Sequence, residues 1–406
     1  MSGSPIIPEE IIAAVANKLN QQTKLPAIQK DTKTKGSSKY IQISNDPSYH
    51  LFAKTTATLK ECKIYENFFH QLEKRTKNNN NNATISTTTG KLQQDITALW
   101  YLTKESPKSK NFYLIVQDLS SKGYSPVSCS IKHPPRLDFN QALIAMQTLA
   151  KLHANSYFYQ GSKSKARTEI LPNFAYLNGG ENFEKILTPI AHQLFEFCCT
   201  SIESENSSVA FKLRKRIPSE ETLARKMWTE ILVQEKYEND DLYVFCHGDL
   251  RPDNIFFDSA GNNCKLVSWD SLCYAPLGSD LAHFMLICLD GVTRDEFEEK
   301  LLAFYCDAFE EELEGRIKDF DVDEFHRNVE DQYRRMMEWA FYRSCFVLPV
   351  LFCKERIGTS FGDWVRASEN VRREWLHCVR DSCMDDVDLR KRLVEGAKKL
   401  IKLKIL

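Results

Sequence analysis

The chain has 406 residues, and 42% of them are hydrophobic, which is enough apolar material for two packed lobes or domains. The 54 Lys and Arg residues balance 55 Asp and Glu residues to a net charge of -1, so no overall field draws the protein to nucleic acid or to an anionic membrane. No run approaches the ~18 apolar residues of a membrane span, and the first residues lack the basic start and apolar stretch of a signal peptide.

The first part of the chain, residues 1–118, is expected to form a small β-rich lobe. Strand-like patterns occur at 40–43, 51–54, 99–102 and 112–116. The first two flank a turn and predict a hairpin, and helical spacing of apolar residues predicts helices at 8–19 and 60–72. The Asn-rich and Thr-rich segment near 77–90 has nothing to bury, so we expect a disordered loop there.

Helical periodicity dominates residues 119–406, which we expect to form a larger lobe. A capping box at 138–141 predicts the start of a helix. The β signals are a strand at 243–246 and a hairpin with strands at 255–257 and 265–269. This order predicts an α+β chain with a small β-rich lobe followed by a mostly helical one, which is the bilobal layout of kinases.

The loop after the strand at 243–246 contains the residues expected to carry chemistry. Residues 247–254 read HGDLRPDN. Asp249 and Asn254 have the five-residue spacing of a kinase catalytic loop, in which the carboxylate orients or deprotonates the acceptor hydroxyl and the amide ligates Mg²⁺. A chance surface turn is the alternative for His247, Gly248 and Asp249 alone, but Asn254 and the flanking strands favour the catalytic loop.

This loop resembles the H-G-D-x-x-x-x-N motif of the aminoglycoside phosphotransferase and choline kinase group. It is more closely similar to that of the insect ecdysteroid kinase-like (CHK kinase-like) family. Residues 116–119 and 149–154 resemble that family's E-D-L hinge and L-A-x-L-H-A helix, in the same order. The resemblance covers most of the chain. It implies the protein kinase-like fold and an ATP- and Mg²⁺-dependent kinase acting on a hydroxyl of a lipophilic, ecdysteroid-like or sterol-like small molecule.

The resemblance extends to residues expected to hold the nucleotide phosphates. Lys54 follows apolar strand residues, as the phosphate-binding lysine on the third strand of kinases does. Glu61, seven residues on, opens the next helix, where it is placed to pair with Lys54. The family has a Glu four positions before a Tyr, and Glu61 and Tyr65 match. The alternative is a solvated lysine beside an ordinary glutamate on a helix surface.

Four further residues are given roles by the resemblance. Asp118 and Leu119 would lie at the hinge, where backbone groups hydrogen-bond adenine. His247 is expected to brace the catalytic loop from within. Asp280 resembles the family aspartate that begins a helix and holds the backbone of that loop, and we assign it no catalytic step.

The second metal ligand departs from the family pattern. The family places an aspartate twelve residues before the position of Asp280, and Ser268 stands there, followed by Trp269 and Asp270. A serine hydroxyl is a poor replacement for a carboxylate on a hard cation. On a strand, Asp270 would face the same side as Ser268 but lie about 6.6 Å further along, at ~3.3 Å per residue.

Three interpretations stay open. Asp270 ligates Mg²⁺ directly or through water, Asn254 and the nucleotide hold it, or the chain no longer transfers phosphate. The segment ahead of Lys54 has Gly36 as its only nearby glycine, and this also favours weak nucleotide binding.

The sequence therefore predicts an ATP-dependent phosphotransferase with an alcohol group as acceptor. A catalytically impaired pseudokinase that serves as a binding or scaffold protein is the alternative. The 13 cysteines form no C-x-x-C pair, so we expect reduced thiols in a cytoplasmic protein. The expected partner is a small hydroxyl-bearing molecule, with no nucleic acid and no membrane span.

Overall fold

The computed structural model describes residues 31–35, 38–42, 50–57, 61–62, 64–69, 91–98, 100–105, 112–127, 136–160, 181–229, 242–314, 316–317, 320–353, 355, 357 and 361–406. The helix expected at 8–19, Gly36 and the segment 77–90 lie outside these residues. The chain divides into two compact units, Met1–Pro126 with Ile255–Asp270, and Val127–Asn254 with Ser271–Leu406. The lobe boundary expected after residue 118 stays a prediction.

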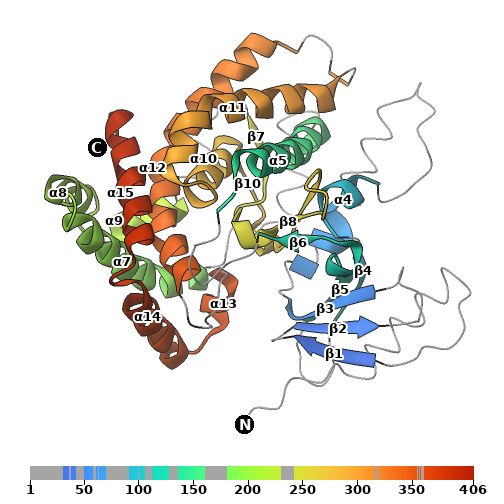
Figure 1. Cartoon of the computed structure of the whole chain (residues 1–406), viewed down its shortest axis with the longest axis horizontal. Coiled ribbons are helices and arrows are strands. Elements are labelled where there is room, and N and C mark those ends of the chain that lie inside the picture. The colour runs from blue at the N-terminus through green and yellow to red at the C-terminus, as the bar shows by residue number, and fades with distance from the viewer. Residues whose placement is uncertain are drawn as a thin grey trace, which may run out of the picture. The chain divides into compact units, whose positions relative to one another are not determined.

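The first unit contains a five-stranded antiparallel sheet, shown in blue and cyan in Figure 1. Its strands are β1 (Asp31–Lys35), β2 (Ser38–Gln42), β3 (His50–Ala57), β4 (Trp100–Glu105) and β5 (Phe112–Gln117), in the order β1-β2-β3-β5-β4. The four strands expected from the sequence are confirmed. β1 was not expected, because its sequence DTKTK has no apolar residue to mark a buried face.

A second, three-stranded sheet of this unit combines β6 (Ser125–Pro126), β8 (Ile255–Phe257) and β9 (Cys264–Leu266). The hairpin of β8 and β9 is confirmed, with Ile255 paired to Leu266. The prediction that the second strand reaches residue 269 is wrong. Ser268 has a φ of 69°, a left-handed conformation, and residues Trp269–Ser271 form a 3-10 turn (η9). The alternation of a strand therefore ends before Asp270.

The described helical parts of this unit are short. Glu61 and Cys62 are helical, Ile64–Phe68 form one wide π-turn (η2), and Lys91–Ile96 form α4. Ile64 and Phe68 are buried, as the helix expected over 60–72 requires.

The second unit is mainly helical. Its longer helices are α5 (Phe139–Gln160), α7 (Glu181–Glu203), α8 (Ser207–Arg216), α10 (Gly278–Ile287), α11 (Gly291–Leu313), α12 (Val322–Phe352), α14 (Glu369–Cys383) and α15 (Val387–Lys402). The shorter α9 (Glu220–Ala224), η6 (Arg225–Thr229) and α13 (Phe361–Arg366) connect them. The α+β class expected from the sequence is confirmed. No described helix has a stretch long and apolar enough to cross a membrane.

Side-chain caps explain where several of these helices begin. The capping box before α5 is confirmed, because Gln141 N donates to Asp138 Oδ1 at 2.9 Å and Asp138 N donates to Gln141 Oε1 at 3.1 Å. Asp290 and Asp321 accept from the first turns of α11 and α12 in the same way. These local bonds fix the entry points of the helices that surround the candidate site.

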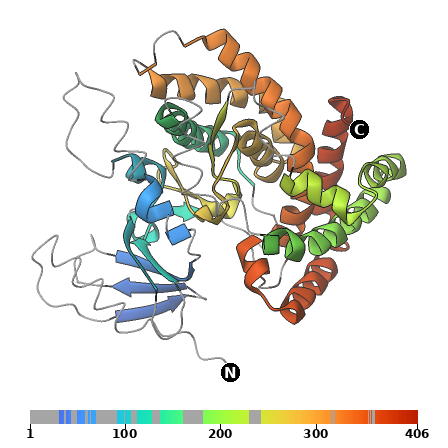
Figure 2. The ribbon, with the colours of Figure 1, turned by 180° about the vertical axis from the view of Figure 1, so that it is seen from behind.

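The core of the second unit lies between α10 and its neighbours. α10 is buried along its whole length and packs along α12, while α5 packs along α11; Figures 1 and 2 show both pairs from opposite sides. A Cβ at Gly278 would lie 2.5 Å from the backbone carbon of Gln332, so glycine permits the close approach of α10 to α12. A two-stranded ribbon of β7 (Tyr243–Cys246) and β10 (Cys273–Pro276) completes this unit.

Candidate active site

The predicted catalytic loop follows β7, whose four residues are all buried. Gly248 has a φ of 79°, and a Cβ there would lie 2.2 Å from the carbonyl oxygen of Ser271. Both the backbone conformation and the available space therefore require glycine at the second position of the loop.

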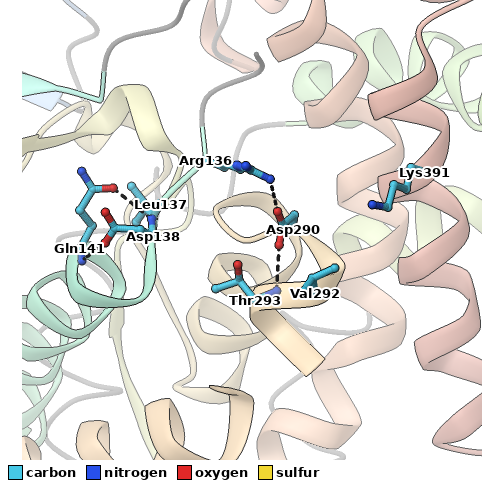
Figure 3. Close-up of a pocket in the computed structure, with 8 residues that line it drawn as sticks. All are labelled: Arg136, Leu137, Asp138, Gln141, Asp290, Val292, Thr293 and Lys391. Atoms are coloured by element: carbon cyan, nitrogen blue, oxygen red, sulfur yellow. Dashed lines mark hydrogen bonds and ion pairs between the residues drawn. The ribbon is translucent and has the colours of Figure 1, made fainter. Parts of the chain in front are cut away.

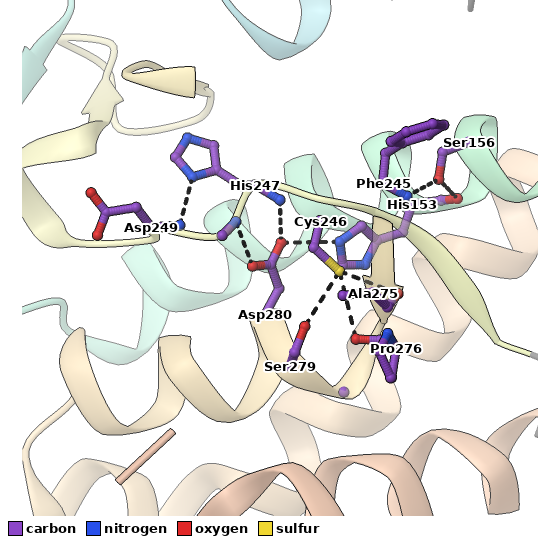
Figure 4. A network of polar contacts seen from close by, with 12 residues as sticks. His153, Ser156, Phe245, Cys246, His247, Asp249, Ala275, Pro276, Ser279 and Asp280 are labelled. Carbon is purple, nitrogen blue, oxygen red and sulfur yellow. Dashed lines mark hydrogen bonds and ion pairs between the residues drawn. The ribbon is translucent and has the colours of Figure 1, made fainter. Parts of the chain in front are cut away.

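Asp280, in the first turn of α10, holds the backbone of this loop, as Figure 4 shows. The N–H of His247 donates to Asp280 Oδ2 at 2.6 Å, and the N–H of Gly248 donates to Oδ1 at 2.9 Å. The role expected for Asp280 is confirmed. Within the loop, Nδ1 of the buried His247 accepts from the N–H of Asp249 at 3.2 Å, which agrees with the expected bracing role.

A second buried histidine, His153 on α5, supports Asp280 from the other side. Its Nε2 lies 3.2 Å from Asp280 Oδ2, and its Nδ1 lies 2.7 Å from the hydroxyl of Tyr305 on α11. Burial alone would raise the pKa of Asp280, but the hydrogen bond and charge of His153, with His247, hold it below its usual value. His153 thus links Asp280 on α10 to Tyr305 on α11.

Cys246 completes a cluster with His153 and Asp280, and these three are close enough for their ligand atoms to surround one metal ion. Cys246 instead donates from Sγ toward the carbonyl oxygens of Ala275 and Pro276, at 3.7 and 3.6 Å. Burial raises the pKa of this thiol well above its usual value, which disfavours the thiolate that binds metal. We interpret the cluster as a hydrogen-bonded brace for the loop.

Asp249 and Asn254 lie together, as their spacing predicted. Asn254 Nδ2 donates to the carbonyl oxygen of Asp249 at 2.8 Å and lies 3.3 Å from Asp249 Oδ2. Asp249 is 2% exposed, and its Oδ1 is buried without a hydrogen-bond partner among the described residues. One carboxylate oxygen is therefore held by Asn254, and the other makes no hydrogen bond within the described part of the chain.

Buried charges surround Asp249. Burial raises the pKa of its carboxyl group, while the nearby guanidinium groups of Arg251 and Arg343 act in the opposite direction and Asp253 adds to the rise. Arg343, on α12, lies over the ring of Trp339 at 4.9 Å. Neither arginine was expected at the site, and the position of Arg251 inside the loop was the only signal in the sequence for it.

The residues expected to hold phosphates lie in the first unit. Lys54 is in the middle of β3 and pairs in register with Leu114 of β5, so its predicted position on the third strand is confirmed. Its side chain lies outside the described atoms. Glu61 is helical and 1% exposed, which argues against an ordinary surface glutamate. The pairing of Lys54 with Glu61 stays a prediction.

The aromatic residue after Ser268 is firmly anchored in the first unit. Trp269 is fully buried, packs edge-on against Phe69 with ring centroids 5.0 Å apart, and donates from Nε1 to Thr97 Oγ1 at 3.1 Å. Thr97 Oγ1 donates to the carbonyl oxygen of Leu266 at 2.5 Å and lies 3.2 Å from the hydroxyl of Tyr65. These contacts hold in place the backbone segment that contains Ser268 and Asp270.

The predicted hinge residues form a tight turn after β5. Asp118 Oδ1 accepts from the N–H of Ser120 at 3.0 Å, and its backbone carbonyl accepts from Ser121 Oγ at 2.7 Å. The carbonyl of Leu119 accepts from the N–H of Tyr124 at 3.0 Å. Both carbonyls therefore already have a partner, and adenine binding at Asp118 and Leu119 stays a prediction.

The loop has donors of the kind that Mg²⁺ prefers, which are oxygen atoms. The hydrogen bonds of Asn254 are made by Nδ2, and in the described part of the chain its Oδ1 has none. Asp249 places a buried carboxylate beside this amide, with Asn254 Nδ2 3.3 Å from its Oδ2. The donor set of the loop fits a divalent cation, while Ser268 adds no charge. Asp270 belongs to the first unit, and its role as a ligand stays a prediction.

A pocket of about 480 Å³ lies where α5 and α11 begin, next to α15, as Figure 3 shows. It contains none of the predicted site residues. Its cations are already paired, Arg136 with Asp290 and Lys391 with Glu395, the latter at 3.9 Å. Its charges therefore point to no particular ligand.

Comparison with known proteins identifies the family. The sequence model of the ecdysteroid kinase-like family matches residues 22–316. Similar solved structures include an ethanolamine kinase from Plasmodium vivax, with 12% identity, a TM-score of 0.46, and 96% of this chain and 93% of that chain covered. An aminoglycoside phosphotransferase from Alicyclobacillus acidocaldarius has 12% identity and a TM-score of 0.42, with 100% and 98% covered.

A choline kinase from Streptococcus pneumoniae has 12% identity and a TM-score of 0.34, with 92% and 99% covered. No curated protein matches the chain in a sequence comparison. At these scores the solved structures carry no argument about substrate, so the assignment rests on the family model, which spans most of the chain.

Proposed function

Because the chain belongs to the ecdysteroid kinase-like family and has the protein kinase-like fold, we propose that it transfers the γ-phosphate of ATP to a hydroxyl of a lipophilic, ecdysteroid-like or sterol-like acceptor. The observation that carries the proposal is the state of Asp249. One of its oxygens is held by Asn254, the other has no partner among the described residues, and the loop backbone is fixed by Asp280.

The arrangement defines the part that Asp249 plays. The acceptor hydroxyl donates to Asp249 Oδ1, and its oxygen attacks the γ-phosphorus as the bond to the bridging oxygen of ADP breaks. The hydroxyl proton passes to Asp249, and ADP leaves with the electron pair of the broken bond. Burial favours the protonated form of Asp249, so this carboxylate is a stronger base than an exposed aspartate.

Other residues bind and orient the nucleotide in this proposal. Lys54, paired with Glu61, positions the phosphates, and the backbone of Asp118 and Leu119 contacts adenine. Asn254, with Asp270 directly or through water, holds Mg²⁺. When bound, the ion would neutralise part of the negative charge of the phosphates.

The test is ADP release from ATP over a panel of ecdysteroids, sterols, phenolic glycosides, choline and aminoglycosides. Wild-type protein is compared with Asp249→Asn and with the matched control Asp307→Asn, an exposed aspartate in the middle of α11. We expect one acceptor class to stimulate release in wild type and in the control but not in Asp249→Asn. If no acceptor raises release above the Asp249→Asn background, the proposal fails.

The position of Ser268 favours a second candidate, a catalytically impaired pseudokinase that has lost Mg²⁺-dependent ATP binding and serves as a binding or scaffold protein. Ser268 stands where the family has a carboxylate, and its left-handed φ of 69° sets the following residues into a turn. A thermal-shift titration separates the two candidates, because a ligand that binds only the folded state stabilises it by RT ln(1+[L]/Kd). The kinase requires a Mg²⁺-dependent shift with ATP, whereas the absence of any shift supports the pseudokinase.

A further inference from the structure

Arg251 has an unusual place in the catalytic loop. It lies two residues after Asp249 and two before Asp253, and it is only 2% exposed although it belongs to no helix or strand. Its Nε forms an ion pair with Asp249 Oδ2 at 3.5 Å without the geometry of a hydrogen bond, and its Nη2 donates to Asp253 Oδ2 at 3.2 Å. Both nitrogens are on the same edge of the guanidinium plane, so one edge serves two carboxylates.

Arg251 thus forms a bridge between Asp249 and Asp253, which leaves one oxygen atom of each carboxylate without a hydrogen-bond partner among the described residues. Asp249 Oδ1 and Asp253 Oδ1 are both buried and make no hydrogen bond with the described residues. The two Oδ2 atoms, by contrast, both face Arg251. Arg251 and Asn254 therefore both engage Oδ2 of Asp249, and Oδ1 is the oxygen left without a partner among the described residues.

The two acidic residues would repel each other without this cation. They lie four positions apart on a short loop, and Asp249 is buried away from water. In such a buried environment the repulsion between like charges is least screened. A guanidinium is suited to the task because its planar fork fixes direction as well as charge, whereas an ammonium is a point charge on a flexible stem.

We propose that Arg251 is a positioning residue, which orients Asp249 by tying its Oδ2 to Asp253, so that Oδ1 meets the acceptor hydroxyl. This proposal rests on the proposed kinase function. Asp253 is the second carboxylate that holds the guanidinium of Arg251 in place. A displacement of about 1 Å of a reacting group is enough to lower a rate by about 10²-fold. We therefore expect the loss of this bridge to lower kcat.

The test uses four variants of the full chain. Arg251→Lys keeps the charge but loses the planar guanidinium edge that faces both carboxylates, and Asp253→Asn removes the charge of the second carboxylate, whose side chain is 31% exposed. The double variant combines them. Arg294→Lys is the matched control, because Arg294 is an equally buried arginine on α11, outside the loop. For each variant we measure Tm, kcat, and KM for ATP and for the acceptor.

We expect Arg251→Lys to lower kcat by about 10-fold to 10²-fold with KM for ATP within about 2-fold of wild type. Asp253→Asn lowers kcat less, by about 3-fold to 10-fold. The double variant loses no more than Arg251→Lys alone, because both substitutions break one bridge. Arg294→Lys keeps the kcat of wild type whatever happens to its Tm.

These outcomes distinguish a failure of the positioning role of Arg251 from a failure of the proposed kinase function. If wild type turns over and folded Arg251→Lys keeps its kcat, or if the losses of the two single variants multiply in the double variant, the positioning role is wrong. If Arg251→Lys does not fold, Asp253→Asn decides: an unchanged kcat overturns the proposal. If wild type itself releases no ADP with any acceptor, the proposed function fails and the positioning role fails with it.

Discussion

Asp280 accepts a 2.6 Å hydrogen bond from the backbone N–H of His247, 33 positions earlier in the chain. A second bond, from the N–H of Gly248, reaches its other oxygen. The shape of the catalytic loop is therefore determined by a carboxylate on α10 as well as by the loop's own sequence.

The first prediction concerns this carboxylate. Asp280→Asn replaces one acceptor oxygen by an NH₂ group that faces a buried N–H donor. We expect a loss of about 2–4 kcal/mol in the free energy of unfolding, together with a lower kcat. Urea denaturation at pH 7 measures the first and ADP release the second. Full stability in Asp280→Asn would contradict the role of these two bonds.

The second prediction is the pH dependence of the same contribution. Because the pKa of Asp280 in the folded state is below its unfolded value of about 3.9, its contribution to stability is present above that value. The contribution is lost as the pH falls through the lower, folded-state pKa. Urea titrations between about pH 6 and pH 2 should show a steeper acid loss in wild type than in Asp280→Asn. Parallel curves would contradict the assignment.

The third prediction is that Asp249 lowers stability while it enables catalysis. Burial raises the folded-state pKa of Asp249, so its favourable contribution exists at low pH and is lost as the pH rises through that pKa. At pH 7, Asp249→Asn should unfold at an equal or higher urea concentration than wild type, and its kcat should fall by about 10²-fold to 10⁴-fold. A destabilised Asp249→Asn protein would show that the charged form contributes to folding.

The fourth prediction compares two glycines with similar backbones. Gly248 and Gly261 have φ values of 79° and 68°, but a Cβ at Gly248 would lie 2.2 Å from the carbonyl oxygen of Ser271, and one at Gly261 would contact nothing within 4 Å. Gly261→Ala should cost about 1–2 kcal/mol for the backbone alone. Gly248→Ala should cost more and abolish turnover. Equal losses in urea denaturation would show that space at Gly248 is not limiting.

The sequence predicted local structure better than it predicted contacts between distant residues. The loop spacing of Asp249 and Asn254, the strands and the capping box of α5 are local patterns, and each is confirmed. The contact of His153 with Tyr305 joins residues 152 positions apart, and no pattern marks it. Likewise, the strand expected to continue to residue 269 is ended by the left-handed backbone of Ser268, which residue type alone does not predict.

The fifth prediction concerns the missing carboxylate. Ser268→Asp returns the ligand that the family pattern has at this position, and we expect a larger Mg²⁺-dependent thermal shift with ATP than wild type shows. Ser268→Gly is the control, since it accepts the φ of 69° without adding a ligand. If activity appears only in Ser268→Asp, the wild-type chain is the pseudokinase.

The most direct measurement is the transfer of labelled phosphate from γ-³²P-ATP to an acceptor, followed by isolation of the product. The account predicts a phosphorylated hydroxyl compound with wild type and with Asp307→Asn, and none with Asp249→Asn. Label that stays in ATP with wild type over the whole acceptor panel, or product formed equally by Asp249→Asn, would contradict it.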